Sequence, residues 1–102
     1  MSADLTPYRG KRALVCGLPK DTALTWMEWS QAVRSVLDII VPLTERCYSG
    51  HAPESAIRAS NAQVVLVCEG SRYGPAMRLA AKAAGVPVLR VRRDGTVEVD
   101  DG

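Results

Sequence analysis

The sequence contains no phenylalanine, and aromatic residues of any kind make up only 5% of its 102 residues. A hydrophobic core must therefore be built from valine, leucine, isoleucine and alanine, a composition typical of strands that are buried on both faces. A chain of this length forms one compact core and is too short for two. We therefore expect a single domain over residues 1–102, with residues 1–10 as a loose lead-in.

Cysteine is also scarce, and its pattern excludes two kinds of small protein. Cys16, Cys47 and Cys68 are an odd number of cysteines without Cys-x-x-Cys spacing, so neither a disulfide framework nor a zinc site is expected. We expect no metal ion and no cofactor. Reduced cysteines that end apolar runs are typical of a reducing compartment, and the predicted location is cytoplasmic.

The sequence has no long hydrophobic run and no large excess of charge. No apolar run approaches the roughly 20 residues of a membrane-spanning helix, and the N-terminal stretch MSADLTPYRGKR lacks the apolar core of a signal peptide. The net charge of +2 is too small to predict nucleic-acid binding. The basic cluster at residues 90–93 is followed by acidic residues at 94–101, a pattern that indicates a solvated strand face and hairpin. A membrane and nucleic acid are therefore not expected as partners.

Short apolar runs alternate with helical patterns along the chain. We expect strands at 12–16, 39–43, 63–68, 86–91 and 96–99, and helices at 26–37, 53–60 and 75–84. This alternation predicts a three-layer, Rossmann-like α/β domain with a parallel sheet. Pro42 lacks the amide that a central strand donates, so the second strand belongs at an edge. The resulting order is the flavodoxin-like 2-1-3-4, and Asp94-Gly95 predicts a two-residue hairpin turn into a short antiparallel edge strand at the C-terminus.

The stretch EGSRYGP, between a buried strand and a helix, contains the candidate ligand-binding residues. In open α/β sheets, ligands bind beyond the carboxyl ends of the strands where the strand order reverses, here between the first and third strands. Two connectors emerge there, and their residues can cradle a phosphate at a helix N-terminus and contact a base or sugar. The expected ligand-binding residues are Gly17, Leu18, Lys20, Glu69, Gly70, Ser71, Arg72, Tyr73 and Gly74. Glu69 and Asp21 are the candidate catalytic residues.

The same residues also have a simpler interpretation, because glycine, serine and proline are ordinary turn residues. Arg72 and Lys20 are then solvated side chains, and Glu69 caps a helix. The convergence of several polar groups on one predicted position favours the binding interpretation.

Residues 57–91 resemble the second half of nucleoside 2-deoxyribosyltransferase-like domains and, more distantly, the SLOG superfamily of Rossmann-like nucleotide-binding proteins. The resemblance depends on a small turn before a strand (Ser60-Asn61-Ala62), a glycine-containing loop and the motif Gly85-Val86-Pro87-Val88. The first strand likewise ends in a small glycine loop, Val15-Cys16-Gly17-Leu18-Pro19. The resemblance implies a nucleotide or nucleoside in the crevice and, in active members, cleavage of an N-glycosidic bond by a carboxylate on the third helix.

The chain departs from that family at the nucleophile. The corresponding position is Met77, with Arg78 beside it, and the predicted helix at 75–84 contains no carboxylate. Gly70-Ser71 loosely matches the phosphate-holding loop of the SLOG proteins. The resemblance therefore implies binding more than catalysis.

Three functions follow from these observations. The first is a cytoplasmic domain that binds a nucleotide or nucleoside-derived phosphate without the usual glutamate nucleophile. The second is a nucleoside or nucleotide N-glycosidase that uses Glu69 or Asp21. The third is a protein-interaction module whose tryptophan-bearing helix (Trp26 and Trp29) offers an apolar surface. Such a module could be encoded by a phage or a mobile element. A homo-oligomer is expected, because small domains often complete their cores by pairing.

Overall fold

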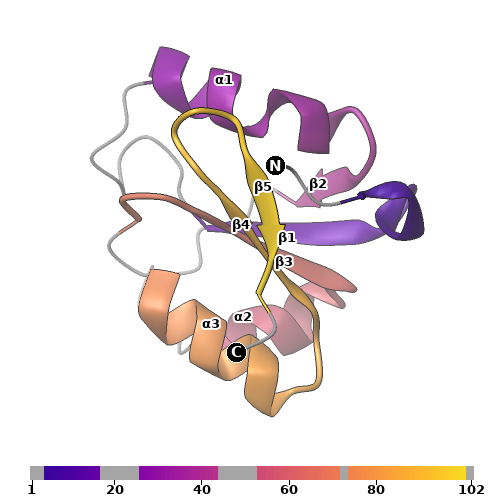
Figure 1. The fold of residues 1–102 in the computed structure, drawn as a ribbon. Helices are drawn as coiled ribbons and strands as arrows, with labels where there is room; N and C mark the ends of the chain where they lie inside the picture. The colour runs from indigo at the N-terminus through magenta and orange to yellow at the C-terminus, as the bar shows by residue number, and fades with distance from the viewer. Residues whose placement is uncertain (1–3, 17–25, 44–52, 72–73, 101–102) are drawn as a thin grey trace.

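The computed structural model describes residues 4–16, 26–43, 53–71 and 74–100, without the side chains of Trp26, Glu28, Trp29, Ala32, Ser35, Pro42 and Leu43. These ranges form a mixed sheet flanked by helices (Figure 1). The strands are β1 (Arg12–Cys16), β2 (Val41–Leu43), β3 (Val64–Cys68), β4 (Val88–Val91) and β5 (Val97–Val99). The helices are α1 (Trp26–Leu37), α2 (Pro53–Ser60) and α3 (Gly74–Ala83), with a short 3-10 helix, η1 (Thr6–Tyr8).

The strands lie in the order β2-β1-β3-β4-β5. β1 pairs in parallel with β2 and β3, and β3 pairs in parallel with β4, whereas β5 pairs antiparallel with β4. The alternating pattern of the sequence therefore gives an α/β fold, and the order of the first four strands is the expected one. Pro42 lies on the edge strand β2, where the missing amide removes no bond of a central strand.

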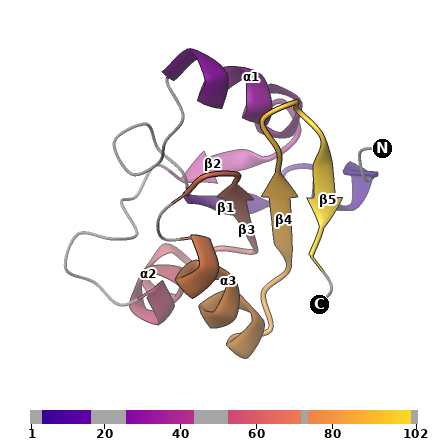
Figure 2. The ribbon, with the colours of Figure 1, turned by 60° about the vertical axis from the view of Figure 1, so that its left-hand side comes forward.

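Helices cover both faces of the sheet (Figure 2). Val36 of α1 packs against one face, whereas Ile57 of α2 and Met77 of α3 pack against the other. Successive residues of a strand point to opposite faces, so that Leu66 of β3 lies on the α1 side and Val65 on the α2–α3 side. Because neither face of the central strands is open to water, both of their side-chain sets must be apolar. This requirement explains the continuous apolar runs of β1 and β3.

The segment before β1 differs from the loose lead-in that the sequence predicted. Leu5 is only 7% exposed and belongs to the core on the α1 side, where Tyr8 of η1 also packs. The backbone N–H of Gly10 donates to the carbonyl of Ile39, at 2.8 Å. Residues 4–10 are thus part of the folded unit, and Leu5 anchors them through hydrophobic burial.

The turn between β4 and β5 has the expected residues but a different length. The N–H of Arg92 donates to the carbonyl of Thr96 at 2.8 Å, and the N–H of Gly95 donates to the carbonyl of Arg92 at 2.9 Å. The loop therefore spans three residues, 93–95, instead of the predicted two. Gly95 has φ +90°, as expected at the left-handed position that closes a three-residue hairpin loop.

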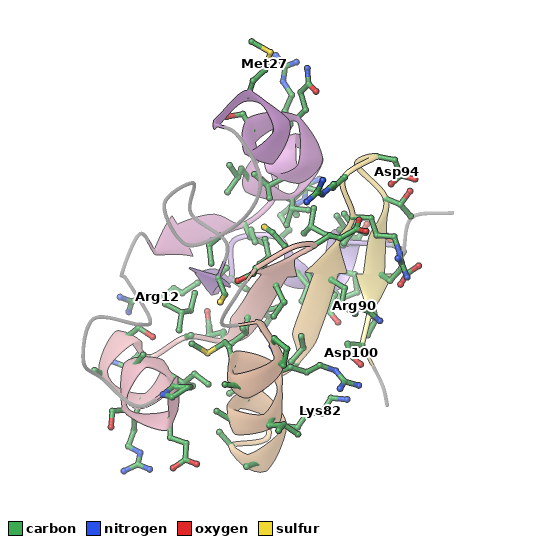
Figure 3. All side chains as sticks on the ribbon, turned by 90° about the vertical axis from the view of Figure 1, so that its left-hand side faces the viewer. Arg12, Met27, Lys82, Arg90, Asp94 and Asp100 are labelled. Atoms are coloured by element: carbon green, nitrogen blue, oxygen red, sulfur yellow. The ribbon has the colours of Figure 1, made fainter. Side chains whose placement is uncertain are left out.

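An ion-pair cluster holds the end of β5 against α3 (Figure 3). The carboxylate of Asp100 accepts hydrogen bonds from Nε and Nη2 of Arg78 and, at 3.1 Å, from Nζ of Lys82. These bonds lower the pKa of Asp100 to about 2, and the hydrogen bond from Arg78 has the larger effect. Because the Asp100 side chain is only 5% exposed, its charge is balanced by Arg78 and Lys82 rather than by water.

Candidate ligand-binding site

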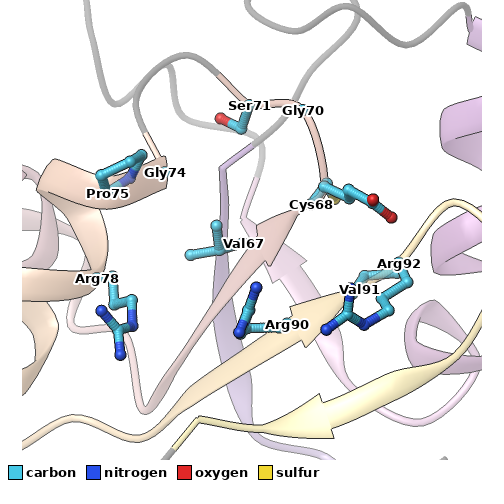
Figure 4. A pocket seen from close by; sticks show the side chains of 11 residues that line it. Val67, Cys68, Gly70, Ser71, Gly74, Pro75, Arg78, Arg90, Val91 and Arg92 are labelled. Carbon is cyan, nitrogen blue, oxygen red and sulfur yellow. The ribbon is translucent and has the colours of Figure 1, made fainter. Parts of the chain in front are cut away.

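A cavity of about 390 Å³ opens between the first turn of α3 and the carboxyl ends of β3 and β4 (Figure 4). Its walls come from residues 67–71, from Gly74, Pro75 and Arg78 of α3, and from residues 90–92. Its volume lies within the roughly 300–1,000 Å³ that small-molecule sites occupy. The position is that of ligand sites in open α/β sheets, beyond the carboxyl ends of parallel strands.

The loop after β3 forms a tight turn at the mouth of this cavity. The N–H of Ser71 donates to the carbonyl of Cys68 at 3.1 Å, and Gly70 has φ +88°. A turn with a positive φ at its third residue strongly favours glycine there. The Sγ of Cys16 and the Oγ of Ser71 are 3.4 Å apart. The end of β1 and the loop after β3 therefore meet, as the sequence predicted.

Helix α3 begins beside the cavity, so that the positive end of its dipole lies at the cavity wall. Its first turn contains no acidic residue, and Pro75 occupies a position where its missing N–H removes no helical bond. The amides of a first helical turn have no partner within the helix, and they favour an anion nearby. The start of α3 thus contributes a positive potential to the cavity wall.

Three arginines supply the remaining positive charge of the wall, and two of them are paired with carboxylates of the β5 end. Arg78 pairs with Asp100, as described above. Arg92 donates from Nε and Nη2 to the two carboxylate oxygens of Glu98, at 3.1 and 3.3 Å. The hydrogen bonds from Arg92 and the charges of Arg92 and Arg90 lower the pKa of Glu98.

Arg90 differs from the other two arginines. It is exposed, and its side chain makes no hydrogen bond or ion pair with any residue in the described ranges. Its register partner is Glu98 of β5, whose carboxylate is held by Arg92. In Figure 4, Arg90 lies on β4 across the cavity from Arg78 on α3. The guanidinium of Arg90 is the charge in this wall that is best able to bind an incoming anion.

Glu69 has a defined structural role at the rim. Its carboxylate accepts a hydrogen bond from the backbone N–H of Arg93 at 2.8 Å, and its own N–H donates to the carbonyl of Val91 at 2.7 Å. Glu69 therefore connects the end of β3 to the β4–β5 turn. One carboxylate oxygen of this candidate catalytic residue is thus already bonded.

The structure brings together four of the residues that the sequence singled out. Glu69, Gly70, Ser71 and Gly74 all line the cavity. The other candidates, including the possible catalytic residue Asp21, lie outside the described residues: Gly17, Leu18, Lys20, Asp21, Arg72 and Tyr73.

The described cavity lies one strand away from the crevice that the sequence predicts between β1 and β3, and the loop after β1 that would line this crevice lies outside the described residues. The strand order predicts a crevice between β1 and β3, whereas the cavity lies between β3, β4 and α3. Three arginines that line this cavity, Arg78, Arg90 and Arg92, are not among the ligand-binding residues that the sequence predicts. The sequence predicts a solvated strand face for Arg90 and Arg92. Their spacing of two residues places both side chains on the same face of a strand, and this pattern alone does not distinguish a solvated face from a cavity wall. Arg78 lies four residues after Gly74, on the same side of α3.

The described residues contain no group of histidine, cysteine, aspartate and glutamate side chains that could hold a metal ion. Met77, at the position of the family's nucleophile, is fully buried in the core between α3 and the sheet. The chain matches no family model, no curated protein and no solved structure. The resemblance to deoxyribosyltransferase-like and SLOG domains therefore stays a prediction from the sequence.

Proposed function

We propose that the protein binds a nucleotide or nucleoside-derived phosphate in the cavity between α3 and β4. The observation that carries this proposal is Arg90, an exposed guanidinium without an ion-pair partner in the described ranges, which lines the same cavity as the first turn of α3. A phosphate there receives charge-assisted hydrogen bonds from Arg90 and amide donors from the helix. The hydroxyl of Ser71 supplies a further donor at the mouth.

The remainder of the cavity suits the less polar part of such a ligand. Val67, Pro75 and Val91 contribute to its walls, so that a ring can lie against apolar side chains while its phosphate faces the arginine. The suggested resemblance to Rossmann-like nucleotide-binding domains points to the same class of ligand. Within α3, the buried Met77 stands where active relatives would have a carboxylate. We therefore propose binding without glycosidic cleavage by a residue of this helix.

The test is a panel of nucleoside mono-, di- and triphosphates, measured by thermal shift and then by calorimetry at low salt. A ligand is expected to raise the melting temperature of the wild type. Arg90→Ala is expected to weaken binding about tenfold or more, the usual contribution of a charge-assisted hydrogen bond. Arg58→Ala removes an exposed arginine of α2 and is the matched control. The proposal fails if no member of the panel binds, or if the two variants behave alike.

A cytoplasmic location and self-association remain separate proposals. No helix within the described ranges is long and apolar enough to cross a membrane. Among the residues whose side chains the structure describes, the exposed large apolar ones lie on four different elements: Met27 on α1, Val41 on β2, Leu79 on α3 and Val99 on β5. Size-exclusion chromatography with light scattering tests self-association directly.

A further inference from the structure

Two carboxylates of the C-terminal segment face the arginines of the cavity. Residues two apart on an extended strand share a face, and Glu98 and Asp100 both point to the side that carries α3, where they meet Arg92 and Arg78. Arg78 and Arg92 also line the cavity. An anion in the cavity therefore competes with groups of the protein itself for two of its three arginines.

The two ion pairs differ in how readily an anion can displace the carboxylate. Asp100 is 5% exposed and is held by both Arg78 and Lys82. The side chains of Arg92 and Glu98 are 41% and 39% exposed, and exposed ion pairs contribute little to stability. Arg92 is thus the arginine that can change partners, and Glu98 is the group that would have to leave.

A displaced Glu98 would still face the ligand. It is the register partner of Arg90, so its carboxylate remains beside the arginine proposed to hold the first phosphoryl group. Glu69, whose charge also acts on Arg92, adds a second negative group at the rim. A ligand with two adjacent phosphoryl groups would therefore bring its second group against carboxylates.

We propose that Glu98 is a specificity-determining residue, which restricts the cavity to ligands with a single phosphoryl group. This inference rests on the proposed function, and it names the ligand class as phosphomonoesters, such as nucleoside monophosphates. A single phosphoryl group binds at Arg90 and leaves the Arg92–Glu98 pair intact. A diphosphate needs Arg92 and meets the repulsion of Glu98.

The experiment compares inorganic phosphate with pyrophosphate, because these probes differ in the number of phosphoryl groups and contain no base. Calorimetry gives both dissociation constants for the wild type, Glu98→Gln and Glu98→Ala. Glu54→Gln, which removes an exposed carboxylate from α2, is the matched control. Since Glu98 belongs to an exposed pair, both Glu98 variants are expected to fold, and circular dichroism with thermal melting verifies this.

In the wild type, pyrophosphate is expected to bind no more tightly than phosphate. Removal of the Glu98 charge is expected to strengthen pyrophosphate binding about tenfold and to change phosphate binding less than about threefold, since like-charge contacts discriminate strongly. Glu54→Gln is expected to change neither. An unchanged ratio of the two constants in both Glu98 variants overturns the role of Glu98. So does the absence of binding by both probes in all variants while a nucleotide still binds. If neither the two probes nor any nucleotide binds, both the role of Glu98 and the proposed function are wrong.

Discussion

The backbone of Gly74 lies directly against the side chain of Val67. A Cβ atom placed on Gly74 would be 2.8 Å from Cγ1 of Val67, which is well inside the usual separation of about 3.5–4.0 Å between carbon atoms. The first turn of α3 can approach the end of β3 only because residue 74 has no side chain. This contact sets the distance between helix and sheet at the cavity.

Gly74→Ala is therefore expected to destabilise the protein. Overpacking typically costs about 1–3 kcal/mol, and the better helix propensity of alanine offsets at most about 1 kcal/mol. We expect a net loss of roughly 1 kcal/mol, measured by urea denaturation. Ligand binding is expected to weaken as well, because α3 must move away from β3.

A double-mutant cycle separates this contact from other effects. Val67→Ala removes the atom that the new Cβ would strike, so the double variant is expected to be about 1 kcal/mol more stable than the sum of the single changes predicts. Additive losses would show that the contact does not limit the approach of α3.

The strand order could be predicted because several residues have only one acceptable place. Pro42 requires an edge, and a run such as VVLVC requires cover on both faces. The C-terminal end of α3 could also be predicted from the glycine that follows it. Gly85 adopts φ +74°, and the N–H of Val86 donates to the carbonyl of Ala81 at 2.8 Å, as in a Schellman cap. Local chemistry alone determines these features.

The missed features depend on contacts between distant parts of the chain. Leu5 lies in a segment without the apolar periodicity that marks a buried element. Arg78 and Arg90 belong to different elements and line one cavity only because α3 packs over β4. Each arginine by itself has the sequence signature of a solvated charge. Their joint position in one wall needs the register and the helix placement, which the sequence does not contain explicitly.

The N-terminal segment provides a second prediction. Leu5→Ala removes a side chain that is 7% exposed within the core, and large-to-small changes at such positions cost about 2 kcal/mol or more. Leu79→Ala is the matched control, because Leu79 is 66% exposed on α3 and changes at exposed positions usually stay within about 0.5 kcal/mol. Urea denaturation of both variants makes the comparison. Equal stabilities would mean that residues 4–10 are only loosely attached.

The Asp100 cluster predicts a specific dependence of stability on pH. The pKa of Asp100 falls from 3.8 to about 2 on folding. A lowered folded-state pKa stabilises the protein at pH values above the unfolded pKa, and this contribution disappears as the pH falls from about 4 to about 2. At neutral pH, it amounts to about 2 kcal/mol.

Asp100→Asn should therefore be less stable than the wild type by about 2 kcal/mol at pH 7, and the difference should shrink toward zero near pH 2. Urea denaturation at pH 7, 4 and 2.5 measures this difference. Asp38→Asn, at an exposed position after α1, controls for the loss of one carboxylate. If the difference in free energy of unfolding between the wild type and Asp100→Asn is the same at all three pH values, packing rather than the charge of Asp100 holds β5 to α3. In that case the ion pair between Arg78 and Asp100 would not be needed to hold β5 against α3.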